Sequence, residues 1–293
     1  MLGDAQVLAD SFYRVLRDGI PLETFMKKVH ELDEIKAEYN FIAEDITEPL
    51  GVAGSLLSWE NRVNSLIMVV DIGAGTSDFS LFRIAFNPDG KKLGSSEVAG
   101  SARGITEAGN YLDKLLNAYI LKKAEVKIDD PHYRNIVGAL NLTIRDNKEA
   151  LFNDDFVSVS LFNGEIAEVN KDEFLSLDSV KQFAAVLKET MIEILEEIDE
   201  SWIKGAPAWS GMPTLAIALT GGGATLPMAK NLAVGKILIN GNRLKIVLSN
   251  SFPQWLEEEG FEDLEEDYPQ IAVSLGGARK LVLPHGDSTA ITA

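Results

Sequence analysis

The sequence contains no cysteine and only three histidines. Without cysteine, disulfide bonds, thiolate catalysis and cysteine-ligated zinc are all excluded. The histidines, His30, His132 and His285, lie far apart in the chain, and no two of them have the spacing of metal ligands. Ser77 lies in Gly-Thr-Ser-Asp and not in a Gly-x-Ser-x-Gly elbow, so the sequence does not support a serine nucleophile.

Long apolar runs and an excess of positive charge are also missing. No run approaches roughly 18 consecutive apolar residues, and the N-terminus lacks a basic region followed by an apolar segment. We therefore expect a soluble, cytoplasmic protein without a membrane partner. The 27 basic and 45 acidic residues give a formal net charge of −18, which repels nucleic acid and anionic lipid. A polyanionic nucleotide would need a local exception, made by backbone amides, a metal ion and a few lysines.

The remaining composition is that of a protein with a substantial core. The 293 residues are 46% hydrophobic and 25% charged, as in one large globular domain or two of ordinary size. Apolar residues recur at helical spacing in 1–19 and again in 22–32, with Gly19-Ile20-Pro21 between them. The sequence therefore begins with two predicted amphipathic helices.

A glycine-rich turn between two apolar runs is the strongest local pattern. Leu66 to Val70 predicts a buried strand that leads to Asp71, and Phe79 to Ile84 predicts the next strand. Between them, Gly73-Ala74-Gly75-Thr76 can bring backbone amides close to an anion. Asp71 and Asp78 flank this turn, as a site for a phosphate and a divalent cation requires. An ordinary glycine-rich hairpin with acidic ends is the alternative interpretation.

Two further stretches place polar groups at the ends of predicted strands. Ile46-Thr47 predicts a short strand before a small-residue helix, so that Glu48 lies at the junction, either facing a cleft or capping the helix. Thr214 to Leu219 predicts a buried strand that runs into Thr220-Gly221-Gly222-Gly223, with a helix from about Pro227. A tight turn without a ligand is the alternative for this second loop.

The other predicted elements are amphipathic helices and hairpins. One hairpin has Asn163-Gly164 at its turn and another has Asn240-Gly241. Gly109 lies in the first turn of a predicted helix, near a further approach for a phosphate. The segment Glu257 to Asp267 is strongly acidic and is expected to be exposed. Helices are predicted over residues 106–123, 141–152, 179–201 and 268–278.

Four stretches in one order carry a family resemblance. They are ITEPLGVAG (46–54), VVDIGAGTSDFSLF (69–82), LTGGGATLP (219–227) and YPQIAVSLGGA (268–278). Together they resemble the actin-like ATPase superfamily, and most closely the C-terminal lobe of the nucleotide-binding domain of DnaK-type heat-shock chaperones. The resemblance covers residues 41 to 283.

The resemblance implies an α/β fold, a ribonuclease-H-like lobe whose mixed sheet of five strands is flanked by helices. Residues 45–123 and 202–293 would form this core subdomain, and residues 124–201 a small α+β subdomain. The N-terminal helices, residues 1–44, would lie at the lobe boundary.

The resemblance also implies a site for Mg²⁺ and ATP or ADP. Asp71 would hold Mg²⁺ through water, and Glu48 would face the metal and the attacking water. Glu48, Asp71 and Thr76 would be the catalytic residues. The residues near the phosphates would be Gly73, Ala74, Gly75, Thr76, Asp78 and Gly109. The residues near the adenosine would be Lys148, Gly221, Gly222 and Gly223.

The chain also departs from the family pattern. The family's first phosphate loop and the lysine of its first lobe have no counterpart, and Arg145, Glu149 and Thr225 replace residues that usually face adenosine. We therefore expect an incomplete cleft, with a missing N-terminal lobe as partner, in the same longer chain or in a separate subunit, and a protein client. ATP hydrolysis would need that lobe. A non-catalytic scaffold of the same fold and an actin-like filament protein remain as alternatives.

Overall fold

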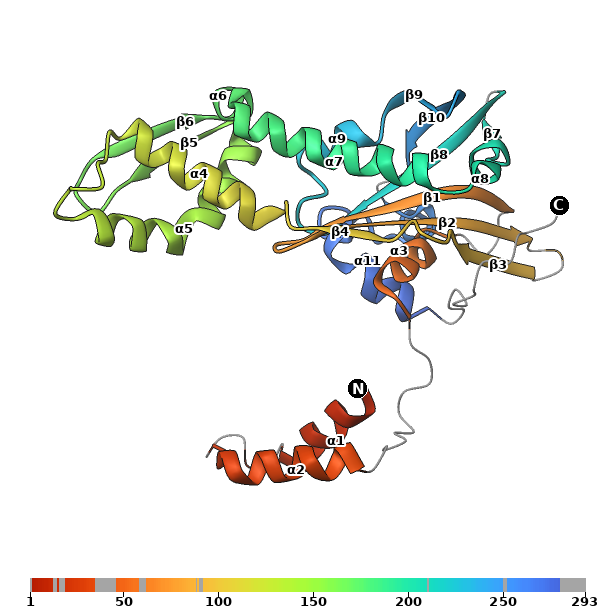
Figure 1. The fold of residues 1–293 in the computed structure, drawn as a ribbon, viewed down its shortest axis with the longest axis horizontal. Coiled ribbons are helices and arrows are strands. Elements are labelled where there is room, and N and C mark those ends of the chain that lie inside the picture. The colour runs from red at the N-terminus through yellow and green to blue at the C-terminus, as the bar shows by residue number, and fades with distance from the viewer. Residues whose placement is uncertain are drawn as a thin grey trace. The chain divides into compact units, whose positions relative to one another are not determined.

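The computed structural model describes residues 2–12, 15, 19–34, 46–57, 62–87, 89, 92–209, 211–249 and 252–279, and the chain divides into two compact units, 1–45 and 46–293 (Figure 1). The first unit contains the two predicted helices, α1 (Leu2–Phe12) and α2 (Leu22–Glu34). The rings of Phe12 and Phe25 lie 5.9 Å apart, so the apolar faces of these helices meet.

The second unit is built on a mixed sheet, which the described residues form from eight strands in the order β3-β2-β1-β8-β10-β9, with β4 beside β2 and β7 beside β8. Strands β1, β8 and β10 are parallel, and the remaining pairs are antiparallel. The number of five, which the family resemblance implies, was too low. Of the additional strands, β4 and β7 are too short to leave a periodic pattern in the sequence. The strands are β1 (Val63–Ile72), β2 (Ser77–Asn87), β3 (Lys92–Glu97), β4 (Arg103–Ile105), β7 (Ala208–Trp209), β8 (Met212–Thr220), β9 (Gly235–Ile239) and β10 (Asn242–Leu248).

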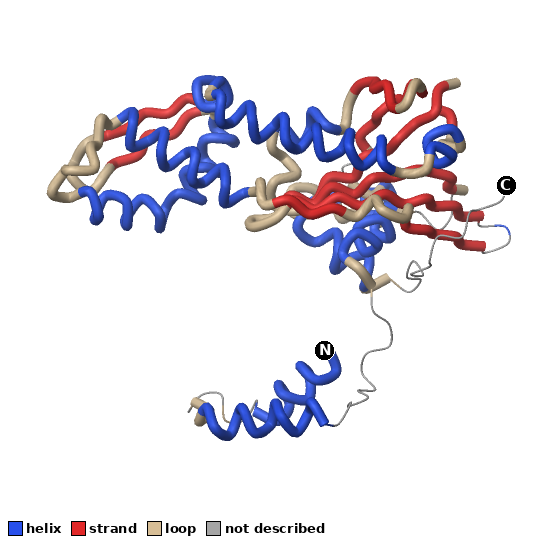
Figure 2. The backbone as a smooth tube through the Cα atoms, viewed as in Figure 1, coloured by secondary structure: helices blue, strands red, loops and turns tan. Residues whose placement is uncertain are grey.

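Helices cover both faces of this sheet (Figure 2). Strand β1 is buried on both sides, because Met68 and Val70 belong to one apolar cluster and Ile67 and Val69 to the other. The structure is therefore a mixed α/β fold, as expected. The larger cluster includes residues of α4 (Gly109–Lys123), α5 (Tyr133–Asp154), α7 (Asp178–Glu197), α8 (Glu200–Lys204) and α9 (Pro227–Leu232), and the smaller includes residues of α3 (Glu48–Leu56), α10 (Gln254–Glu258) and α11 (Tyr268–Gly277).

A separate two-stranded sheet, β5 (Phe156–Ser160) with β6 (Ile166–Asn170), packs against α4, α5 and α6 (Lys171–Ser176). The predicted turn at Asn163-Gly164 is confirmed, and Gly164 has a φ of 87°. Two predictions were wrong. Ile46 and Thr47 lie in no strand, and the helix expected over 179–201 ends at Glu197, after which Asp199 caps α8.

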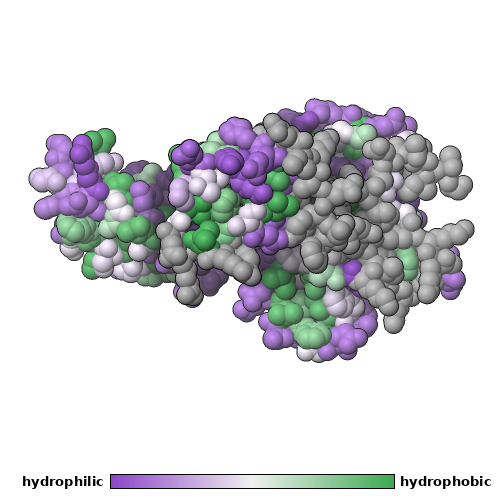
Figure 3. All heavy atoms as spheres, turned by 90° about the horizontal axis from the view of Figure 1, so that it is seen from below, coloured by the Kyte–Doolittle hydropathy of each residue, from purple (hydrophilic) through white to green (hydrophobic). Residues whose placement is uncertain are grey.

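The surface mixes hydrophilic and hydrophobic residues, as the view in Figure 3 shows for one face. In the part of the chain that the structure describes, no helix combines the length and the apolarity that crossing a membrane requires.

Helices α3 and α11 approach so closely that only glycine fits where they cross. A Cβ atom on Gly51 would lie 2.8 Å from the Val273 carbonyl oxygen, and one on Gly276 would overlap the Gly51 carbonyl. The other end of α3 is bound by Arg279, whose guanidinium donates to the Gly54 carbonyl at 3.1 Å. This packing fixes the helix that carries Glu48 at its first turn.

We expect Gly276→Ala to destabilise the fold by about 1–3 kcal/mol, because the added methyl group must push α3 away from α11. Gly277→Ala is the matched control. Its Cβ would lie 3.4 Å from the Ile46 side chain, an ordinary contact, so alanine should be neutral or stabilise the helix by up to about 1 kcal/mol. Urea unfolding of the two variants measures the difference, and equal stabilities would contradict this account of the crossing.

Candidate functional site

Two loops that lie far apart in the sequence meet at one edge of the sheet. Strands β1 and β8 are parallel neighbours in a register that pairs Asp71 with Thr220. Their carboxyl ends therefore open at the same edge, where ligands of α/β proteins commonly bind. The Gly223 amide donates to the Ile72 carbonyl at 2.9 Å, which ties the second loop to the end of β1.

Two of the three glycines in the second loop have a packing reason to be glycine. Gly221 has a φ of 78°, and its Cβ would lie 2.6 Å from the Ile72 carbonyl oxygen and would overlap the Asp71 carboxylate. A Cβ on Gly223 would lie 2.8 Å from that of Ile72. Gly222 is exposed, with nothing within 4 Å of the corresponding position. Neighbouring atoms therefore fill the side-chain positions of Gly221 and Gly223, whereas a ligand could approach Gly222.

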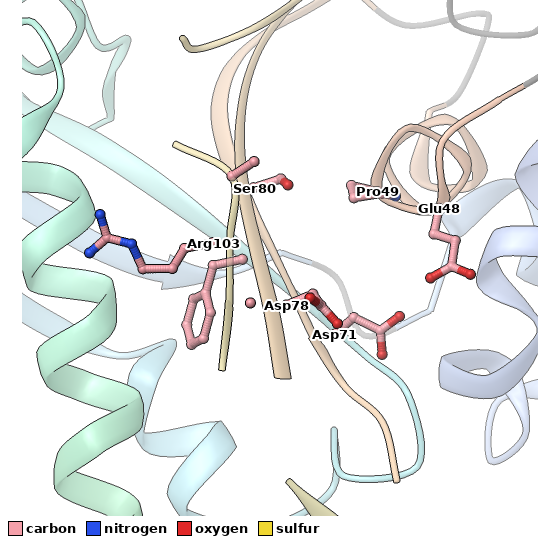
Figure 4. A pocket seen from close by; sticks show the side chains of 9 residues that line it. Glu48, Pro49, Asp71, Asp78, Ser80 and Arg103 are labelled. Carbon is pink, nitrogen blue, oxygen red and sulfur yellow. The ribbon is translucent and has the colours of Figure 1, made fainter. Parts of the chain in front are cut away.

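Three carboxylates converge beside these loops (Figure 4). Asp71 is paired with Asp78 across the β1–β2 hairpin, and Glu48 begins α3. All three line a cavity of about 450 Å³, together with Ser80 and Arg103. The Thr76 hydroxyl donates to the Asp78 carboxylate at 2.7 Å.

The electrostatics of this cluster are unfavourable without a cation. Burial, then Glu48, then Asp78 raise the pKa of Asp71 from its ordinary 3.8 to about 6. Arg103 lines the cavity, but its guanidinium is turned toward α7, where it pairs with Glu193 at 3.2 Å and Glu197 at 2.6 Å (Figure 4). No lysine or arginine among the described residues forms an ion pair with the three carboxylates.

Helix α4 sets the orientation of the first loop. The Gly73 carbonyl accepts from the Gly109 amide at 3.0 Å, and the Ala74 carbonyl from the Asn110 amide at 2.7 Å. In a planar trans peptide the N–H points opposite to the C=O, so the amides of Ala74 and Gly75 point away from α4. Neither donates to a group in the described ranges, and both residues are exposed. The loop therefore presents two consecutive unbonded amides.

Gly109 and Lys148 lie behind this loop. The Lys148 ammonium pairs with Asp113 at 2.7 Å and donates to the Gly109 carbonyl at 3.2 Å. A Cβ on Gly109 would lie 3.1 Å from the Gly73 carbonyl oxygen, so glycine permits the close approach of α4. The structure thus brings every predicted site residue to this edge of the sheet or directly behind it. Contact of Gly109 and Lys148 with a nucleotide stays a prediction.

Sequence reasoning missed Asp113, Asn110 and Arg103. Asp113 lies one turn after Gly109, a spacing that marks it as a neighbour on α4, but no sequence pattern pairs it with Lys148. Arg145 lies elsewhere, in a second cavity of about 510 Å³ between α4 and α5.

No protein-family model and no curated protein matches this chain. A function for this chain must therefore be argued from its own sequence motifs and from the geometry of this site.

We expect Asp71→Asn to change how stability depends on pH. Because the pKa of Asp71 is about 6 when folded and 3.8 ordinarily, the folded state binds the proton more tightly, and stability falls as pH rises through this window. Asparagine carries no charge, so the variant should melt at a higher temperature than the wild type above about pH 6 and at a similar temperature near pH 4. Thermal melts across this range test it, with the exposed Asp129→Asn as control. A constant difference at all pH values would contradict the prediction.

Removal of the Lys148 ammonium should loosen the loop. We expect Lys148→Met to cost of the order of 3 kcal/mol, because it leaves the Asp113 carboxylate buried and unpaired. Hydrogen exchange at the Gly109 and Asn110 amides should become faster. The control is Lys123→Met, whose partner Glu173 is half exposed, so the loss of this ion pair should cost much less stability. Unchanged exchange at these two amides would show that Lys148 does not hold the turn.

Proposed function

We propose that residues 46–279 form the C-terminal nucleotide-binding lobe of a chaperone-like, DnaK-type ATPase of the actin-like superfamily, with a ribonuclease-H-like core. The observation that carries this proposal is the pair of outward amides at Ala74 and Gly75, beside three carboxylates at the edge where β1 and β8 end. The sheet supports the fold assignment, since its antiparallel part β3-β2-β1 is extended by parallel β8 and β10 with helices on both faces.

The loop suits a phosphate rather than another ligand. Consecutive backbone N–H groups that point to one side form a concave anion site, and a phosphate oxygen is a strong acceptor. In a chain with a formal net charge of −18, such amides can bind an anion where the overall field opposes it. Gly222, exposed in the neighbouring loop, offers close approach to a second part of the same ligand.

The carboxylates fit a hydrated magnesium ion. Carboxylate and water oxygens are the ligands that Mg²⁺ prefers, and the raised pKa of Asp71 marks an excess of negative charge that a divalent cation would relieve. Within the described ranges, no three histidine, cysteine, aspartate or glutamate side chains are grouped closely enough to hold a metal ion by themselves. When bound, Mg²⁺ would neutralise part of the negative charge of the phosphates.

We propose that a second lobe, in the same longer chain or in a separate subunit, covers the exposed side of the loop. Phosphoryl transfer depends on positioning and charge neutralisation, so hydrolysis requires both walls of the cleft. Glu48, Asp71 and Thr76 would then act on the metal and the attacking water. A non-catalytic scaffold of the same fold is a second candidate, which one observation favours: the Lys148 ammonium is already paired with Asp113 at 2.7 Å.

Amide NMR spectra during titration with Mg-ADP test the proposal on the chain alone. We expect weak binding, with chemical-shift changes at Ala74, Gly75 and Gly222 and none at the β5–β6 hairpin. In Asp71→Asn the magnesium-dependent part of the response should be lost, because the carboxylate that faces the cation is removed. Asp129→Asn, which removes an exposed charge elsewhere, should respond as the wild type does.

Other outcomes would redirect or remove this assignment. Shifts confined to residues outside the two loops would show that they do not bind phosphate. A tight complex by calorimetry would show that no second lobe is needed. Nucleotide-dependent sedimentation of polymer would favour the filament protein, and Mg-ATP hydrolysis lost in Asp71→Asn would exclude the scaffold.

A further inference from the structure

Positive charge is concentrated in one part of this acidic chain. From Ser201 to Leu256 the sequence contains no aspartate or glutamate, although the chain has 45 acidic residues in total. This stretch includes the sheet edge formed by β9 and β10 (Figure 1). Its basic residues are Lys204, Lys230, Lys236, Arg243 and Lys245.

The strand register gathers three of these basic residues on one side of the hairpin. Lys236 is paired with Lys245, and Leu238 with Arg243, and paired residues point to the same face of a sheet. The opposite face of the hairpin packs on the larger apolar cluster through Leu244 and Ile246. Lys236 and Arg243 are exposed, and 64% of Leu238 is exposed. We call Lys236, Leu238, Arg243 and Lys245 the basic face.

This arrangement has an electrostatic cost within one copy. Lys236 and Arg243 are diagonal neighbours on one face of the strand pair, so their like charges repel each other. No ion pair between described residues involves Lys236 or Arg243. An anionic surface laid against the basic face would offset that repulsion.

A complementary surface follows directly in the chain. In the segment Glu257–Asp267, which we call the acidic segment, every residue except Gly260, Phe261 and Leu264 is acidic, and all of these acids are exposed. Phe261 is 47% exposed. No ion pair of the described residues involves this segment. It therefore combines strong negative charge with an exposed aromatic ring.

Both surfaces lie on the same side of the sheet. Val247 shares the side of Lys245 and is paired with Ala216, which packs on the smaller apolar cluster. Leu256, directly before the acidic segment, and Leu264, within it, pack on that same cluster. Two oppositely charged surfaces on one side of a sheet can each meet the other in a second copy related by a two-fold rotation.

We propose that two copies of this chain associate about a two-fold axis, with the basic face of each against the acidic segment of the other. Leu238 and Phe261 would supply apolar contact inside two rims of ion pairs. Exposed ion pairs contribute little each and are screened by salt, so the dimer is weak and salt-dependent. Nucleic acid suits the basic face less well, because the acidic segment on the same side of the sheet and the net charge of −18 repel it.

Sedimentation velocity of the full chain tests this interface. We expect a concentration-dependent dimer whose dissociation constant rises at least about tenfold between about 50 and about 500 mM NaCl. The double variant Lys236→Glu with Arg243→Glu should remain monomeric, because its altered face repels the acidic segment. Glu262→Lys with Glu266→Lys should dimerise more weakly than the wild type, because two of the acidic residues become basic. An equimolar mixture of these two double variants should associate more than Lys236→Glu with Arg243→Glu does alone, because one contact pairs an unchanged basic face with an unchanged acidic segment. This rescue separates a direct contact from a folding defect.

The matched control is Lys122→Glu with Lys188→Glu, which makes the same change in net charge at exposed positions elsewhere and should dimerise as the wild type does. A wild type that stays monomeric at low salt overturns the proposal. Failure of the mixture to associate, while both variants melt as the wild type does, overturns it as well. Binding of a mixed-sequence DNA duplex that Lys236→Glu with Arg243→Glu abolishes, without dimerisation, would assign the basic face to nucleic acid instead.

Discussion

The parallel pairing of β1 with β8 is the contact on which the site depends. Its register places Asp71 beside Thr220 and allows the Gly223 amide to reach the Ile72 carbonyl. A slip of one residue would turn every side chain of β1 to the other face and remove the carboxylate from the edge. The backbone pairing of these two buried strands therefore holds the two loops of the site together.

The cluster of carboxylates lowers the stability of the folded state, and the needs of folding alone do not explain it. Burial and two neighbouring acids disfavour the charged form of Asp71, and Arg103, which could neutralise them, is drawn away by Glu193 and Glu197. A fold under selection for stability alone would tend to neutralise such a group. Strongly shifted groups beside a cavity mark functional sites more often than structural ones, and here two loops with exposed backbone lie next to them.

The sequence predicted those parts of the fold that depend on local pattern. Apolar runs located β1 and β8, and Asn163-Gly164 located a turn, because each pattern reports a local conformation. It could not predict β4, which three residues form only because β2 offers an edge. Nor could it pair Asp113 with Lys148, since helices α4 and α5 meet through tertiary packing. The triple-glycine loop was ambiguous, because Gly221 and Gly223 have a reason to be glycine that involves no ligand.

Net charge constrains the partners of this chain only coarsely, because it averages over surfaces that the fold separates. A value of −18 predicts repulsion of anions, yet the amides of Ala74 and Gly75 carry partial positive charge that no count of side chains includes. The β9–β10 edge differs in the same way, since its register gathers Lys236 and Arg243 on one face. Screening limits each field to about 10 Å at ordinary salt, so a partner meets the local charge and not the sum. Whether an acidic chain can bind an anion therefore depends on the local arrangement of its amides and charges and not on its net charge.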